Sequence, residues 1–132
     1  MILGIGIDIV KIDRIQNLYH RFGGRFLQRI YSEGELELAR NMHDQIGILA
    51  KRWAAKEACS KALGTGMTQG VAWRDIEVIR QRSGMPGLTL NGHSRTRLEQ
   101  MLPANHSARL HLTMSDDRPC AVACVVIEAV PR

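Results

Sequence analysis

Apolar and polar positions alternate over the opening segment, residues 2–10, which reads ILGIGIDIV. A two-residue period places every second side chain on the same face of a β-strand. We expect one face of this strand to be buried in the core, and its residues are Leu3, Ile5, Ile7 and Ile9. The other face carries two glycines beside Asp8, so it predicts close approach by another part of the molecule.

A three- and four-residue spacing of apolar positions follows from Lys11 to about Leu27 and predicts a helix with a break at Gly23-Gly24. Ser32 followed by Glu35 is typical of a capping box, which predicts a second, short helix. A long alanine-rich helix is expected from about Gln45 to Leu63. The glycines that follow it are a strong stop signal.

The second half of the chain has the shorter periods of strands and turns. Residues 76–79 and 88–90 read as a hairpin around a turn at 83–87, and residues 93–101 read as an amphipathic helix. Strands are expected at about 108–115 and 121–130, and the tight turn between them implies antiparallel pairing. The predicted fold is therefore α+β, with a mainly antiparallel sheet packed against a long helix.

Composition limits the organisation of the chain. With 132 residues and 45% hydrophobic content, the chain is long enough for one core, so we predict a single domain over residues 1–132. No run of eighteen apolar residues occurs, and the first ten residues lack a basic start and a cleavage-site pattern, so we expect a cytoplasmic protein without membrane association. The three cysteines lack CxxC spacing and are interpreted as reduced thiols.

The positive charge is concentrated near the N-terminus. The formal net charge is +5, and residues 11–30 carry five basic side chains against one acidic one, a local excess of +4. A basic patch favours an acidic partner, and charge alone leaves open nucleic acid, anionic lipid and an acidic protein.

Asp8 and Glu57 are the strongest candidates for chemistry, because one lies in an apolar strand and the other in a helix of small residues. Burying an isolated carboxylate is costly, and a divalent cation is one way to neutralise two of them. Magnesium takes one or two protein carboxylates and completes its octahedron with waters and phosphate oxygens. The alternative is structural: Glu57 forms a surface ion pair with Lys61, and Asp8 caps a local turn.

Basic residues of the same helix extend this candidate site. Lys61 lies one helical turn beyond Glu57, so a phosphate beside the metal would meet its ammonium group. Arg52 is a further candidate for phosphate binding, although Arg52 and Lys56 also read as solvated helix charges. The backbone at Gly64 and Thr65 is a candidate for close approach to a ligand, while glycine helix stops without ligands are common.

Two long motifs carry a resemblance to a known family. GIGIDIVKIDRI at residues 4–15 and KRWAAKEACSKALGTGM at residues 51–67 resemble the paired signature of the holo-[acyl-carrier-protein] synthases, the small single-domain 4′-phosphopantetheinyl transferases. The resemblance extends from Ile2 to Glu128 and includes DIEVI and the closing CAVACVVIE. It implies transfer of 4′-phosphopantetheine from coenzyme A to a serine of apo-acyl carrier protein, with release of 3′,5′-ADP, in support of fatty acid biosynthesis.

The resemblance also implies roles for particular residues. The family's magnesium-binding aspartate and glutamate match Asp8 and Glu57, and its phosphate-contacting lysine matches Lys61. Residues expected to contact the acyl carrier protein are Arg14, Arg21 and Arg25, which the spacing places near one face of a helix. The resemblance further implies a homotrimer with coenzyme A in clefts between subunits.

The chain departs from the family pattern at two positions. Asp116 stands where many members have a histidine, and Met85 stands where a lysine is frequent before the turn proline. One alternative is therefore a regulator that binds coenzyme A without catalysis. A second alternative is a nucleic-acid-binding module, motivated by the basic segment, but the few aromatic residues form no RNA-binding strand motif and we expect no nucleic acid partner. His111 and His43 are interpreted as structural or surface residues.

Overall fold

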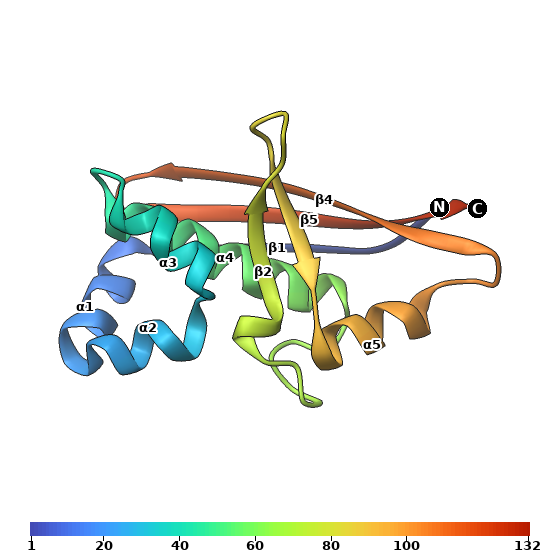
Figure 1. Cartoon of the computed structure of the whole chain (residues 1–132), viewed down its shortest axis with the longest axis horizontal. Coiled ribbons are helices and arrows are strands. Elements are labelled where there is room, and N and C mark those ends of the chain that lie inside the picture. Colours follow the sequence, from blue (N-terminus) through green and yellow to red (C-terminus); the bar gives the residue numbers. More distant parts are fainter.

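The structure of the protein is a computed structural model that describes all residues from 1 to 132 (Figure 1). Five strands, five α-helices and one 3-10 helix follow each other along the chain. Their bounds are β1 Ile2–Lys11, α1 Ile12–Phe22, α2 Gly24–Ile30, α3 Glu33–Arg40, α4 Gln45–Ala62, η1 Trp73–Asp75, β2 Ile76–Arg80, β3 Pro86–Leu90, α5 Gly92–Met101, β4 His106–Asp117 and β5 Cys120–Pro131.

The strands form two antiparallel sheets. The first has the order β1-β5-β4, with β5 in the centre, and the second is the β2-β3 hairpin. The sequence therefore predicted the antiparallel pairing and the α+β class correctly. The chain ends lie side by side, because the Met1 amino group donates to the Ala129 carbonyl at 3.0 Å (Figure 1).

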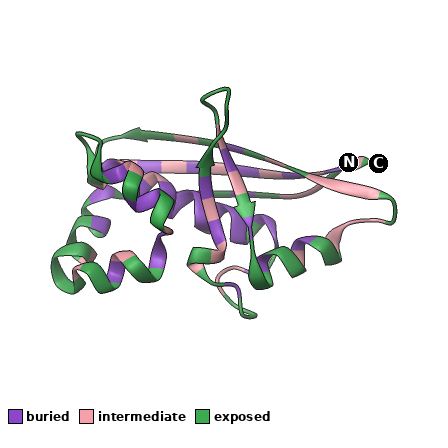
Figure 2. Cartoon of the chain, viewed as in Figure 1, coloured by how far each residue is buried: buried purple, intermediate pink, exposed green.

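Helix α4 lies at the centre of the molecule and is buried on almost all sides (Figure 2). It packs against β1 and β5 on one side, and against α1, α3 and β2 on others. A helix enclosed in this way needs small side chains where it contacts its neighbours, which explains its many alanines. The alanines Ala50, Ala54, Ala55 and Ala58 are fully buried.

The expected burial of β1 was wrong. Ile5, Ile7 and Ile9 are 68%, 62% and 67% exposed in this chain. The face that packs against α4 is instead the one with the glycines and Asp8, because the absence of side chains lets the helix backbone approach the strand. The strand therefore leaves an uncovered row of isoleucines on the outer face of the sheet.

Other predicted elements are present, with changes at their ends. The helix expected over residues 11–27 is two helices, because Gly23 has a positive φ of 60° and the chain turns there. The capping box is formed: the Glu35 backbone N–H donates to the Ser32 hydroxyl at 3.2 Å, and the Ser32 N–H donates to the Glu35 carboxylate at 2.8 Å.

A buried ion pair joins α3 to α4. Lys56 Nζ lies 2.8 Å from Glu35 Oε1, and both side chains are fully buried. The ammonium also donates to the Trp73 carbonyl at 3.0 Å and to the Ile76 carbonyl, so its three donors are satisfied. Burial lowers the pKa of Lys56, and Glu35 opposes this effect. The interpretation of Lys56 as a solvated helix charge was therefore wrong.

Candidate active site

The site begins with a close contact between β1 and α4. A Cβ atom added to Gly6 would lie 1.9 Å from the Ala58 carbonyl oxygen, and one added to Gly4 would lie 2.0 Å from the Ala62 carbonyl oxygen. These distances are shorter than any van der Waals contact, so only glycine fits at either position. The contact brings Asp8, two residues after Gly6, alongside the C-terminal half of α4.

Asp8 and Lys61 form an ion pair across this contact. Lys61 Nζ lies 3.2 Å from Asp8 Oδ1 and also donates to the Ile7 carbonyl at 3.0 Å. The Asp8 side chain is 15% exposed and that of Lys61 is 50% exposed. Lys61 thus pairs with Asp8 rather than with Glu57, so the structural alternative of a Glu57–Lys61 surface ion pair does not describe this site.

The charges of Asp8 and Lys61 both act on Glu57. Partial burial raises the pKa of Glu57, and the neighbouring Asp8 carboxylate raises it further. Lys61 and Arg14 lower the same pKa, so Glu57 is within electrostatic reach of both acidic and basic neighbours. Asp8 and Lys61 therefore meet where β1 crosses α4, and Glu57 lies within electrostatic reach of both, while the catalytic and metal-binding roles of the three residues stay predictions.

The donor set fits a hard divalent cation. No group of three or more His, Cys, Asp or Glu side chains could hold a metal in this chain, so a protein-only metal cage is absent. Two neighbouring carboxylates, Asp8 and Glu57, are nonetheless the kind of partial oxygen shell that magnesium completes with waters and phosphate.

Arg52 lies in a second, basic pocket on α4. A cavity of about 240 Å³ is bordered by α3, α4, the β2-β3 hairpin and β4, and its basic lining residues are Lys51, Arg52 and Arg80. Arg52 is only 7% exposed, its Nε has no hydrogen-bond partner, and burial lowers its pKa. The reading of Arg52 as a solvated charge was wrong. A buried guanidinium without a partner favours an anionic ligand.

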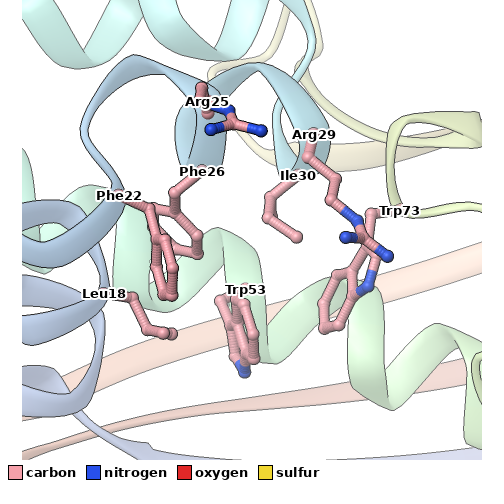
Figure 3. Close-up of a pocket in the computed structure, with 8 residues that line it drawn as sticks. All are labelled: Leu18, Phe22, Arg25, Phe26, Arg29, Ile30, Trp53 and Trp73. Carbon is pink, nitrogen blue, oxygen red and sulfur yellow. The ribbon is translucent and has the colours of Figure 1, made fainter.

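An aromatic pocket borders α4 one helical turn before Glu57, and the sequence reasoning missed it. A cavity of about 500 Å³ opens between α1, α2, α4 and η1 (Figure 3). Trp53, one helical turn before Glu57, stacks on Trp73 with ring centroids 4.3 Å apart, and the Arg14 guanidinium lies 5.5 Å from the Trp53 ring. The remaining lining residues are Leu18, Phe22, Arg25, Phe26, Arg29 and Ile30.

The three candidate arginines are exposed, but they do not share one helix. Arg14 and Arg21 lie on α1, whereas Arg25 lies on α2 because the chain turns at Gly23. Arg25 borders the aromatic pocket (Figure 3), while Arg21 contacts the Phe22 ring at 5.2 Å. The basic surface therefore surrounds the pocket from two helices.

The loop after α4 has the backbone that its glycines predicted. Gly64 and Gly66 have positive φ angles of 79° and 58°. Thr65 is almost buried, and its backbone N–H donates to the Ser60 carbonyl at 3.2 Å. This hydrogen bond terminates α4 at its C-terminal end. A ligand role for Gly64 and Thr65 stays a prediction.

The two departures from the family pattern differ in their surroundings. Asp116 forms an ion pair with Lys51 at 3.2 Å, beside the basic pocket. Met85 is 61% exposed in the turn of the hairpin. His111 is an exposed residue whose Nε2 lies 3.0 Å from Glu128 Oε1, in agreement with its interpretation as a surface residue.

The structure contains no helix with the length and the apolar character that a membrane span requires.

Comparisons with known proteins agree with this geometry. The model of the 4′-phosphopantetheinyl transferase superfamily matches residues 4–123. The holo-[acyl-carrier-protein] synthases of Methylorubrum populi and Mesorhizobium japonicum are 53% and 52% identical over 131 residues, which cover 99% of this chain and 96% of each relative.

Solved structures show the same fold. The holo-[acyl-carrier-protein] synthase of Neisseria meningitidis superposes with a TM-score of 0.85 at 38% identity, over 97% of this chain and 99% of that one. The synthase of Bacillus anthracis, solved in complex with CoA (3′,5′-ADP), has a TM-score of 0.78 at 36% identity, over 98% of this chain and 99% of that one. This chain belongs to the holo-[acyl-carrier-protein] synthase family, within the 4′-phosphopantetheinyl transferase superfamily.

Proposed function

We propose that this chain transfers the 4′-phosphopantetheine group of coenzyme A to a serine of apo-acyl carrier protein and releases 3′,5′-ADP. The observation that carries the proposal is the meeting of Asp8, Glu57 and Lys61 at the contact of β1 with α4. Family membership supports the reaction, and the Bacillus anthracis relative was solved with the coenzyme.

Magnesium is the cofactor that the two carboxylates would hold. Asp8 and Glu57 supply two oxygen ligands, and Lys61 stands beside them for a phosphate oxygen. When bound, the cation would neutralise charge on the diphosphate and lower the pKa of a nearby water.

The chain's own residues position and neutralise the reacting groups. The serine oxygen forms a bond to the β-phosphorus, and the bond from that phosphorus to the bridging oxygen of 3′,5′-ADP breaks, so negative charge accumulates on the leaving group. Lys61 is half-exposed and able to reach this charge. The serine proton passes to a water that Glu57 or Asp8 holds, or to an acidic residue of the carrier.

The nucleotide half of coenzyme A is proposed to occupy the basic pocket beside Arg52. Its phosphates would supply the acceptors that the buried guanidinium lacks, with Lys51 and Arg80 as further cations. Arg52 lies on α4, and Asp8 lies on β1, which packs against the same helix. Gly64 and Thr65, at the end of that helix, are proposed to contact the pantetheine side of the coenzyme.

The basic surface of α1 and α2 is proposed to bind the acyl carrier protein. Arg14, Arg21 and Arg25 are exposed there around the aromatic pocket, so the surface fits an acidic protein that presents an apolar side chain. Salt should weaken this association mainly through its rate. We also propose that the chain acts in the cytoplasm, where its three cysteines would stay reduced.

Assembly is proposed to cover the outer face of the sheet. Ile5, Ile7 and Ile9 pair across the sheet with Val126, Cys124 and Val122, so an apolar area remains open on β1 and β5. Ile7 and Ile9 lie on either side of Asp8 in β1 but point to the opposite face, so a copy on the outer face would contact the strand that carries Asp8. This supports the homotrimer that the resemblance implies, with coenzyme A between neighbouring subunits.

Mass spectrometry tests the proposed function. Apo-carrier incubated with coenzyme A, magnesium and the enzyme should gain the mass of one phosphopantetheine group. Glu57→Gln should abolish the gain while keeping the thermal transition. Coenzyme binding without any mass gain would support the regulator, and salt-sensitive binding of RNA or DNA without mass gain would support the nucleic-acid module.

A further inference from the structure

An aspartate lies next to the cations of the basic pocket. Asp116 follows Met114 by two residues on β4, so their side chains share one face of the strand, and Met114 lines the pocket. Asp116 Oδ1 lies 3.2 Å from Lys51 Nζ. The pocket therefore holds Arg52, whose buried Nε has no hydrogen-bond partner, beside Lys51, whose charge is already paired.

The position of Asp116 is held by a second ion pair that does not depend on Lys51. Arg118 Nη2 lies 3.0 Å from Asp44 Oδ1, and Asp44 also accepts from the Gly47 N–H at 3.1 Å as the N-cap of α4. The turn between β4 and β5 is thus fixed to the start of the helix.

We propose that Asp116 is an internal counter-ion that competes with the phosphates of the nucleotide for Lys51 and thereby sets the affinity of the basic pocket. This proposal rests on the proposed role of that pocket in binding the nucleotide half of coenzyme A. An ionised aspartate only accepts hydrogen bonds, so Asp116 offers a phosphate no direct contact and acts by holding Lys51. The Lys51–Asp116 pair is partly exposed, with side chains 26% and 32% accessible, so a phosphate can displace it.

The proposal predicts a shared effect on substrate and product. Coenzyme A and 3′,5′-ADP share the 3′-phosphate and the phosphate attached to the 5′-oxygen, so Asp116 weakens the binding of both. Asp116 therefore lowers the affinity of the pocket for the nucleotide and favours product release. Its carboxylate does not act on the reacting phosphorus.

Isothermal titration of the whole chain with 3′,5′-ADP tests the proposal. Asp116→Asn should tighten binding about twofold to fivefold. The gain should disappear in the Lys51→Met background, because the competition requires the ammonium group. The KM for coenzyme A should fall by the same factor without a rise in kcat. Asp117→Asn is the matched control: it makes the same change in net charge one residue further, on the opposite face of β4, and should leave binding unchanged.

Four results would overturn the proposal. Weaker binding by Asp116→Asn would show that the carboxylate contributes to the nucleotide site. An equal gain in Asp117→Asn would assign the effect to net charge. Unchanged binding in Asp116→Asn, with weaker binding in Arg52→Met, would refute the competition for Lys51 but would support nucleotide binding in the basic pocket. Unchanged binding in both variants would refute the pocket as well.

Discussion

Replacing Gly6 by alanine tests how the strand–helix contact builds the site. The added Cβ would lie 1.9 Å from the Ala58 carbonyl oxygen and 2.8 Å from the Ala62 backbone nitrogen. Both neighbours are backbone atoms inside a buried helix, so neither can be relieved by a change of rotamer. The strand and the helix must therefore move apart near Asp8.

The size of the effect follows from that displacement. To reach ordinary van der Waals contact, the two backbones must separate by about 1 Å or more, and overpacking of this kind typically costs about 1–3 kcal/mol of unfolding free energy. A displacement of about 1 Å between groups that must act together lowers turnover by about 100-fold. Gly6→Ala should therefore lose far more activity than stability.

The assay compares Gly6→Ala with a matched glycine variant. Gly24, at the start of α2, has open space around an added Cβ and no positive φ, so Gly24→Ala should keep wild-type activity. Carrier modification is followed by mass spectrometry, and unfolding by denaturant at one fixed protein concentration. Wild-type kcat/KM in Gly6→Ala would refute the claim that close approach of β1 to α4 positions the reacting groups.

Further predictions concern charge, core and assembly. Because burial raises the pKa of Glu57, the metal-free protein should lose stability as the pH rises through that pKa, and Glu57→Gln should flatten this dependence in thermal melts. Lys56→Met leaves the buried Glu35 carboxylate unpaired and should cost about 3–5 kcal/mol in denaturant unfolding, whereas Lys61→Met should cost little. Ile7→Glu should convert a trimer to monomers in sedimentation, and an unchanged sedimentation coefficient would contradict an interface on this face.

The sequence identified most elements because local signals and the fold agree. The capping box at Ser32, the alanine-rich helix and the glycine stop at Gly64 all depend on neighbouring residues, and all are present. The inward face of β1 could not be predicted from alternation alone. Both faces lacked charged residues apart from Asp8, and the choice was decided by the close approach of a helix backbone far along the chain.

The candidate site likewise combines features that the sequence predicted with features that it did not. The convergence of Asp8, Glu57 and Lys61 was predictable because the family motifs name those positions. The burial of Arg52 and Lys56 was not, because helix periodicity gives no reason to enclose α4 on almost every side. The aromatic pocket depends on stacking between Trp53 and Trp73, which are twenty residues apart and have no local signal that joins them.

A double-mutant cycle on carrier modification tests the central claim, that Asp8 and Glu57 act as one unit around a single cation. The kcat/KM values for apo-carrier are measured for Asp8→Asn, Glu57→Gln and the double variant, with coenzyme A and magnesium at saturating concentrations. The account predicts that either single variant loses about as much activity as the double variant, because removing one ligand already removes the site. Losses that multiply in the double variant, or wild-type turnover by either folded single variant, would contradict it.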